Sequence, residues 1–279
     1  MHFTKVEAIG NHFVLIDARD LPEMDWLALA TQMCARGFGV GSDGLLVISG
    51  SESADFRFRM WNPDGTEDVC GNGMRCGAVF LVEKGLVEKS SISFEAKSGI
   101  VHVDVSIDEE GIRYARVNMG VPSTRAGDIP IALPVDDGLN VPLSAEGQMY
   151  VANCVLVGTP HAVIFADVSH FWERIPPVSA EIERHPLFPE RINVTWCHVE
   201  SPDSLVIRTW ERGVGPTLGC GSGACAALVA ANLHGLAGTS ASVRSPGGVL
   251  QVEWPGRGDV FVSGPARIVF EGEWKQAVA

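Results

Sequence analysis

The chain has 279 residues, of which 46% are apolar, and its formal net charge is −13. This acidic balance, with no cluster of Lys and Arg to offset it, excludes a nucleic-acid partner. No apolar stretch approaches the roughly 20 residues of a membrane span, and the N-terminus lacks the basic start and apolar run of a signal peptide. We therefore expect a cytoplasmic protein with no membrane partner, whose seven cysteines are reduced thiols.

The predicted elements are short strands interrupted by a few helices. Alternating or β-branched runs predict strands at 12–17, 44–49, 56–61 and 100–105. A helix is predicted at 24–36. Two longer apolar segments each begin just after a Cys-Gly-x-Gly and end at a basic residue followed by glycine, at Lys84-Gly85 and His234-Gly235. The fold class is therefore α+β, a curved sheet wrapped on a helix in each half.

The chain also repeats itself. Residues 70–86 (CGNGMRCGAVFLVEKGL) align without a gap on residues 220–236 (CGSGACAALVAANLHGL), at an offset of 150. The flanking segments extend the match, for example FRFRMW to LVIRTW and GNHFVLID to GTPHAVIFAD. We expect two pseudo-symmetric halves, 1–117 and 118–264, with the C-terminal segment 265–279 returning to the first half.

Each repeat places a cysteine, Cys70 or Cys220, at a glycine-rich turn that enters a helix. Glycine lets the backbone approach a ligand closely, and the unbonded N–H groups of a helix start bind an anion such as a carboxylate. The positive helix end also favours the thiolate form of a nearby cysteine. One thiolate and one thiol on opposite faces of an α-carbon would serve as the base and the acid that invert it.

Other interpretations compete with this one. A cysteine is usually inert packing, which is the expected role of Cys34, Cys76, Cys154, Cys197 and Cys225. A zinc site is disfavoured because the cysteine pairs are spaced C-x5-C and C-x4-C, and a structural disulfide is disfavoured in a reducing compartment. The G-x-G-x-x-G within 37–44 follows a helix instead of a strand, so a nucleotide site is a minor option.

The chain resembles the diaminopimelate epimerase family. The residues that carry the resemblance extend over nearly the whole chain, in 3–18, 39–48, 61–76, 158–165, 191–194 and 211–227. The resemblance implies two halves, each a barrel-like, mostly antiparallel sheet around a central helix, with the active site in the cleft between them. It also implies a small-molecule amino-acid substrate, no pyridoxal phosphate or other cofactor, no metal and a homodimer.

The resemblance assigns roles by position. Cys70 and Cys220 match the catalytic pair, and Asn11 matches a residue that contacts the substrate. His161 and Glu211 match residues that tune the cysteines. The backbone cradle for the reacting carboxylate matches Gly71, Asn72, Gly221 and Ser222. The residues that hold the distal end of the substrate match Asn62, Asn193, Glu211 and Arg212, of which Arg212 suits a carboxylate.

One position departs from the family pattern. Thr159 stands where the family has a substrate-binding asparagine, and threonine offers one hydroxyl in place of an amide. The leading hypothesis is interconversion of LL- and meso-diaminopimelate, a step toward lysine and peptidoglycan. The alternatives are a racemase of another amino acid, such as histidine, and a non-catalytic ligand-binding relative. In the latter case Asn11 and Asn62 would be turn residues and Glu211 and Arg212 a surface pair.

Overall fold

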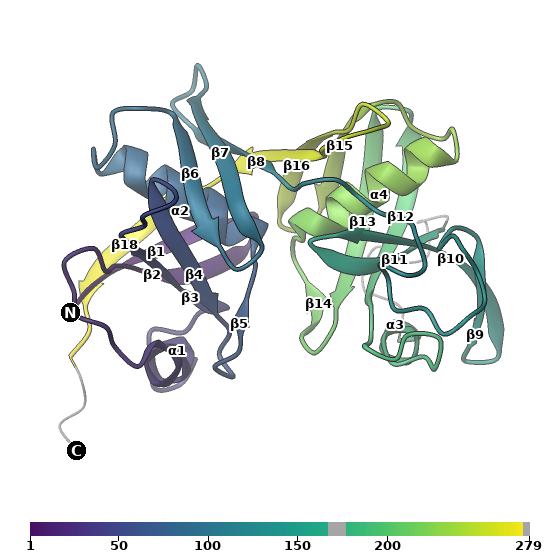
Figure 1. The fold of residues 1–279 in the computed structure, drawn as a ribbon, viewed down its shortest axis with the longest axis horizontal. Helices are drawn as coiled ribbons and strands as arrows, with labels where there is room; N and C mark the ends of the chain where they lie inside the picture. Colours follow the sequence, from purple (N-terminus) through teal and green to yellow (C-terminus); the bar gives the residue numbers. More distant parts are fainter. Residues whose placement is uncertain (167–176, 276–279) are drawn as a thin grey trace. The chain divides into compact units, whose positions relative to one another are not determined.

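The structure is a computed structural model that describes residues 1–166 and 177–275 (Figure 1). The chain divides into two compact units, which we call unit 1 (residues 1–117 and 263–279) and unit 2 (residues 118–262). Residues 276–279 of the expected return segment, and Asp167 at the end of one repeat, lie outside the described residues. Each unit is described below by itself.

Unit 1 is a mixed sheet with two helices. Its helices are α1 (Trp26–Cys34) and α2 (Gly71–Glu83). Its strands are β1 (His2–Ala8), β2 (Asn11–Asp17), β3 (Gly44–Ser49), β4 (Phe56–Trp61), β5 (Glu67–Asp68), β6 (Ser91–Ala96), β7 (Gly99–Ile107), β8 (Arg113–Asn118, which ends in unit 2) and β18 (Arg267–Glu273). The C-terminal strand β18 pairs antiparallel with β1, and β2 pairs parallel with β3.

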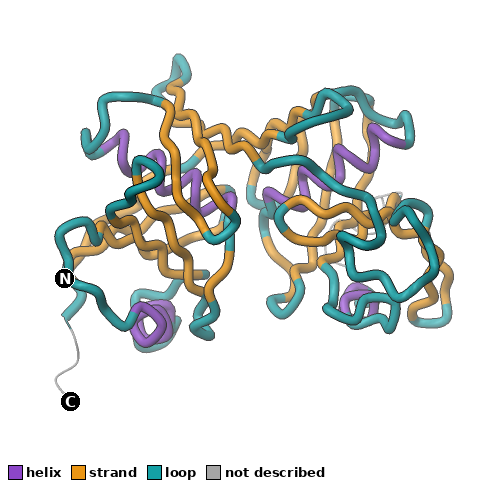
Figure 2. The backbone as a smooth tube through the Cα atoms, in the orientation of Figure 1, coloured by secondary structure: helices purple, strands orange, loops and turns teal. Residues whose placement is uncertain are grey.

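The helix α2 lies against strands from both ends of unit 1. It contacts β1, β2, β3, β4, β7 and β18, so strands line it on several sides (Figure 2). Ten of its residues, from Asn72 to Leu81, are buried. A second cluster, centred on Trp26, Met33 and Trp61, packs α1 against the outer side of the sheet. Packed side chains therefore hold both α1 and α2 against the sheet.

Unit 2 repeats this plan. Its helices are α3 (Ser179–Glu183) and α4 (Gly221–Leu233). Its strands are β9 (Val141–Ala145), β10 (Gln148–Val157), β11 (Thr159–Phe165), β12 (Asn193–Ser201), β13 (Ser204–Glu211), β14 (Gly215–Thr217), β15 (Ser240–Ser245), β16 (Gly248–Glu253) and β17 (Phe261–Pro265, which ends in unit 1). Strands β11 and β12 are parallel, as β2 and β3 are in unit 1.

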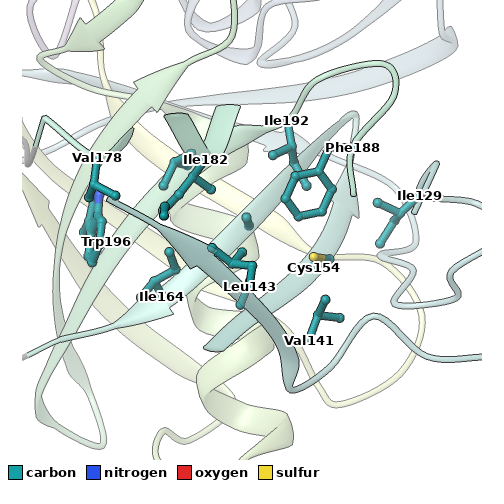
Figure 3. Close-up of a cluster of buried hydrophobic side chains, with 14 residues drawn as sticks. Ile129, Val141, Leu143, Cys154, Ile164, Val178, Ile182, Phe188, Ile192 and Trp196 are labelled. Atoms are coloured by element: carbon teal, nitrogen blue, oxygen red, sulfur yellow. The ribbon is translucent and has the colours of Figure 1, made fainter. Parts of the chain in front are cut away.

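The helix α4 is the apolar centre of unit 2. It contacts β10, β11, β12, β13, β15 and β16, and ten of its residues are buried. Figure 3 shows a neighbouring cluster in which Ile164, Ile182, Phe188 and Trp196 pack together. Alanine at many α4 positions suits this site because small side chains let the strands approach the helix axis.

The predicted elements are confirmed with small shifts at their ends. The predicted strands appear as β2, β3, β4 and β7, and the helix predicted at 24–36 is two residues shorter at each end, because Asp25 caps it through a hydrogen bond to the Ala28 N–H. Helices α2 and α4 end at Glu83 and Leu233, with Lys84 and His234 as their C-caps, followed by Gly85 and Gly235 with φ of 64° and 69°. The α+β class is confirmed.

Candidate active site

Cys70 and Cys220 occupy the same position in their units, the N-cap of α2 and of α4. Their backbone angles agree closely, with φ and ψ of −135° and 110° at Cys70 and −133° and 114° at Cys220. Each carbonyl accepts the first helical hydrogen bond, from Met74 at 2.9 Å and from Ala224 at 3.0 Å. Both sulfurs therefore lie at the positive end of a buried helix, where an anion is stabilised.

The glycines three residues beyond these cysteines let each helix start pack tightly. A Cβ on Gly73 would lie 2.9 Å from Leu46 Cδ2, and a Cβ on Gly223 would lie 3.0 Å from Thr209 Oγ1. A side chain at either position would therefore require the neighbouring side chains to shift. The N–H groups of the first turn, including those of Gly71, Asn72, Gly221 and Ser222, can then serve as anion donors.

In unit 1, a chain of hydrogen bonds leads away from the first turn of α2. Arg75 donates to Asn72 Oδ1 at 2.9 Å, and Asn72 Nδ2 donates to Asn11 Oδ1 at 3.2 Å. Asn11 Nδ2 donates to Asp43 Oδ2 at 2.7 Å. Because a guanidinium only donates and a carboxylate only accepts, the two ends fix both amides in one orientation. Asn11 and Asn72, two predicted substrate-binding residues, are thus brought together.

Asp43 is itself held by its surroundings. Its carboxylate also accepts the His12 N–H at 3.0 Å. The Lys5 ammonium, most of it buried, donates to the Gly41 carbonyl and contacts His12 Nδ1 at 2.9 Å. Burial lowers the pKa of Lys5, and burial also lowers the pKa of His12. The loop before β3 is tied to β1 and β2 through these contacts.

Asn62 lies elsewhere in unit 1, at the turn that follows β4. Its side-chain amide donates to Thr66 Oγ1 at 3.0 Å, and its backbone N–H donates to the Thr66 carbonyl at 2.8 Å. In the structure Asn62 therefore shapes its own turn, which is the common use of asparagine at such a site.

In unit 2, the predicted residues form one connected cluster beside Cys220. Ser222 Oγ lies 3.4 Å from Cys220 Sγ and 2.9 Å from His161 Nε2. Thr159 Oγ1 lies 3.3 Å from His161 Nε2 and 3.4 Å from Ser222 Oγ. Asn193 Nδ2 donates to Thr159 Oγ1 at 3.2 Å. Thr159 is therefore part of the hydrogen-bonding around the histidine.

His161 is fully enclosed in unit 2. Its other ring nitrogen, Nδ1, lies 3.0 Å from Thr195 Oγ1. Burial, helped by the charge of Arg212, lowers the pKa of His161 to about 3. The ring is therefore neutral at physiological pH and carries one proton, which makes it a hydrogen-bonding partner instead of a charge.

Glu211 and Arg212 lie at the hairpin that joins β13 to β14. Glu211 accepts a hydrogen bond from Thr217 at 2.7 Å, and the Arg212 N–H donates to Asn193 Oδ1 at 2.9 Å. The Arg212 guanidinium donates to the Glu190 carbonyl at 3.3 Å. Arg212 is partly exposed, so its guanidinium retains donors that a carboxylate could use.

The residue that holds this hairpin is Glu183, at the end of α3. Its carboxylate is 1% exposed and accepts from Trp210 Nε1 at 2.7 Å and from the Gly213 N–H at 3.0 Å. It also pairs with Arg191 at 3.4 Å. A buried carboxylate with three donors thus holds the Trp210 side chain before Arg212 and the Gly213 backbone after it.

Four residues that support the candidate site through hydrogen bonds were not identified from the sequence, namely Asp43, Arg75, Glu183 and Thr195. Arg75 had a visible signal, because it is a charge within the apolar run of α2. Thr195 had a weaker one, a polar residue at an inward position of β12, in register opposite Thr209. Asp43 lies in a glycine-rich loop and Glu183 in a short helix, and neither context distinguishes them from surface carboxylates.

The remaining cysteines match the expectation of inert packing. Burial raises the pKa of Cys154 and of Cys197 to about 12, and it also raises the pKa of Cys34 and Cys76. All seven cysteines lie in the described part of the chain, and no disulfide joins any of them. Among residues 1–166 and 177–275, no group of three or more His, Cys, Asp or Glu side chains is arranged to hold a metal ion, and no helix is long and apolar enough to cross a membrane.

The fold is shared with a group of solved structures. A phenazine biosynthesis protein of the PhzF family from Bacillus anthracis superposes with a TM-score of 0.72 at 19% identity, covering 99% of each chain. A probable proline racemase from Agrobacterium radiobacter superposes with a TM-score of 0.72 at 16% identity, covering 99% of this chain and 93% of that one. At these identities the likeness defines the fold class alone, that of the PhzF and proline racemase structures.

Sequence comparison defines the family within this class. The diaminopimelate epimerase family model matches residues 3–125 and 153–269. The diaminopimelate epimerase of Pelotomaculum thermopropionicum is 42% identical over 98% of this chain and 99% of its own. That of Desulforudis audaxviator is 41% identical over 99% of this chain and 100% of its own. The chain belongs to the diaminopimelate epimerase family.

Proposed function

We propose that the protein is a diaminopimelate epimerase, an isomerase that interconverts LL- and meso-2,6-diaminopimelate by proton transfer at the α-carbon. The observation that carries this proposal is the pair of N-cap cysteines with nearly equal backbone angles, in a chain about two-fifths identical to diaminopimelate epimerases along its whole length. The reaction is part of lysine and peptidoglycan precursor synthesis.

In the proposed mechanism Cys70 and Cys220 are the two catalytic residues. One thiolate removes the α-proton, and the other residue, as a thiol, delivers a proton to the opposite face of the same carbon. In the reverse direction the two exchange roles. The helix-start N–H groups of Gly71, Asn72, Gly221 and Ser222 bind the α-carboxylate and stabilise the negative charge that develops as the proton leaves. No cofactor and no metal takes part in this proposal.

The proposed substrate-binding residues follow the hydrogen bonds. Asn11 is held by Asp43 with a fixed amide orientation, which suits it to contact the substrate. Arg212 binds the distal carboxylate, because its guanidinium is partly exposed and its backbone is held by Asn193. The other proposed contacts are those of Asn62, Thr159, Asn193 and Glu211. His161 and Glu211 tune the cysteines.

Deuterium exchange tests the proposal directly. The protein is incubated in deuterated water with LL-diaminopimelate, meso-diaminopimelate, histidine and proline, and the α-deuterium of each recovered amino acid is measured by mass spectrometry. We expect exchange only with the two diaminopimelates. Exchange with histidine or proline but not with diaminopimelate would replace the substrate, as Thr159 could allow. No exchange with any substrate would favour a non-catalytic relative.

The assembly and the location of the protein are further proposals. The family resemblance supports a homodimer that acts in the cytoplasm, and light scattering of the purified chain is expected to give twice the mass of 29.8 kDa. A single-chain mass at the concentration of the activity assay would exclude the dimer. The small-molecule substrate and the net charge of −13 are consistent with the absence of a nucleic-acid partner.

A further inference from the structure

The protons in the cluster beside Cys220 can be placed one by one, starting from Asn193. Its Oδ1 accepts the Arg212 N–H, and its Nδ2 donates to the Pro160 carbonyl, both at 2.9 Å. A backbone N–H only donates and a carbonyl only accepts, so this amide has one orientation. Its Nδ2 therefore donates to Thr159 Oγ1 as well, and Thr159 must direct its own proton elsewhere.

Thr195 fixes the proton on the histidine ring. Its side chain is completely buried, and among the described residues its hydroxyl makes one hydrogen-bond contact, with His161 Nδ1. A buried hydroxyl proton without an acceptor costs about 1–3 kcal/mol, so Thr195 donates to Nδ1. The single proton of the neutral ring then lies on Nε2.

The remaining hydrogen bonds lead to Ser222, and from Ser222 to Cys220. His161 Nε2 donates to Ser222 Oγ at 2.9 Å, and Thr159 directs its proton to the same oxygen at 3.4 Å. Both lone pairs of Ser222 Oγ are then used, and its proton points to Cys220 Sγ at 3.4 Å. In this arrangement every hydroxyl and imidazole proton of the cluster has an acceptor.

We propose that Thr195 and Ser222 are positioning residues of a hydrogen-bond relay, running from Thr195 through His161 and Ser222 to the Cys220 sulfur, that stabilises the ionised form of this thiol. A hydrogen bond donated to a thiolate favours the charged form, and successive hydrogen bonds strengthen one another. No bond forms or breaks in the relay. Its role in turnover rests on the proposed function, whereas the relay itself is independent of any substrate.

Unit 1 supports the assignment by contrast. Phe13, Leu46 and Met60 occupy the positions in β2, β3 and β4 that His161, Thr195 and Thr209 occupy in β11, β12 and β13, as the strand registers show. All three are apolar and buried. Burying polar side chains in unit 2 is costly unless they have partners. His161 and Thr195 are partners of each other, so this polar pair, present beneath α4 and absent beneath α2, indicates a role specific to Cys220.

The relay is tested by alkylation of the full-length protein with iodoacetamide, with each cysteine followed separately by peptide mass spectrometry. In Ser222→Ala, we expect alkylation of Cys220 at about pH 7 to slow about tenfold, the effect of losing one hydrogen bond to a charged group. The midpoint of its pH profile should move to higher pH. Cys70 should react at its original rate and serves as the internal control.

Two further variants separate positioning from packing. Ser222→Thr keeps the hydroxyl and should restore the rate, whereas Thr195→Val should slow Cys220 alkylation about threefold, by weakening the relay at its far end. The matched control is Thr209→Val, since the Thr209 hydroxyl has no hydrogen-bond partner among the described residues. It should leave the rate unchanged. Local unfolding would accelerate alkylation, so a damaged fold cannot imitate the expected result.

Nitrogen-15 NMR of the labelled histidines gives an independent measurement. We expect the His161 ring to carry its proton on Nε2 and not to titrate from about pH 5 to pH 9. A proton on Nδ1, or an unchanged Cys220 rate in Ser222→Ala, would overturn the relay. Neither measurement uses diaminopimelate, so failure of the proposed function, seen as no deuterium exchange, is a separate result.

Discussion

The two cysteine-bearing helices have nearly equal N-cap backbone angles. The side chains on which their first turns pack, which we call the floor of each helix, differ in chemistry. In unit 1, α2 rests on Leu46 and Phe58, with Gly73 in close contact. In unit 2, α4 rests on the hydroxyls of Thr195 and Thr209 and on His161, with Gly223 in close contact. The duplicated fold thus keeps the N-cap backbone angles in both units, whereas the side chains beneath the helix differ, and only the Cys70 sulfur accepts a capping hydrogen bond, from the Gly73 N–H at 3.3 Å.

The polar networks differ in the same way. In unit 1 the hydrogen bonds run from Arg75 through two asparagines to the carboxylate of Asp43. In unit 2 they run through His161 and Ser222 toward Cys220. The first network fixes the orientation of two amides, and the second reaches a sulfur. A pseudo-symmetric frame therefore supports two cysteines in unlike surroundings.

The largest expected effect comes from removing either cysteine. Cys70→Ala and Cys220→Ala should each lower kcat/KM for diaminopimelate at least about 1,000-fold, because each removes one of the two groups that transfer the proton. Cys197→Ala is the control, since its buried thiol lies within β12 and is no part of the proposed site. Full turnover in both single variants would refute the two-thiol mechanism.

The contrast between the floors predicts the next effect. Leu46→Thr should lower the free energy of unfolding by about 3 kcal/mol, because it removes buried apolar volume and buries a hydroxyl among apolar neighbours. Thr209→Val, at the neighbouring position of the polar floor, should change it by less than about 1 kcal/mol. Urea unfolding measures both, and equal costs would show that the two floors do not differ as described.

A smaller effect is expected at the end of the unit 1 network. Asp43→Asn should lower kcat/KM about tenfold, because Asp43 Oδ2 accepts from both Asn11 and His12, and a neutral amide in its place accepts more weakly and no longer fixes the Asn11 amide. Asp17→Asn is the control and should keep full activity, because Asp17, at the end of β2, pairs with Arg19 and not with Asn11. Steady-state kinetics measures kcat/KM and circular dichroism checks the fold, and an unchanged kcat/KM in Asp43→Asn would contradict the role given to this network.

The last expected effect is a pH dependence of stability. The folded protein holds the pKa of His161 at about 3, whereas the ring ordinarily titrates near 6.5. Between these values the unfolded state binds more protons, so stability is complete above about pH 6.5 and falls as the pH is lowered, by at most about 1.4 kcal/mol per pH unit.

The variant His161→Gln should flatten this slope in urea unfolding experiments carried out from about pH 4 to pH 7. His102→Gln, on an exposed position of β7, should keep the original slope. An unchanged slope in His161→Gln would mean that the ring becomes protonated in the folded protein.

Much of the fold and part of the site could be predicted from the sequence. The repeat at an offset of 150, the helix stops at Gly85 and Gly235, and the N-cap cysteines are all recorded in short stretches of chain. Asn62 shows the limit of such reasoning, since in the structure its hydrogen bonds serve its own turn. A role carried over by position does not reveal which contacts a side chain makes.

The sequence by itself determined where each helix begins and ends and which residue caps it, because capping depends on neighbours three or four positions away. Only the tertiary structure decided that Thr195 reaches His161, that Asp43 holds Asn11, and that Glu183 supports the hairpin of Arg212. Those partners lie about 30 residues apart and meet through strand register and packing. A one-residue change of register would turn each side chain to the other face of the sheet.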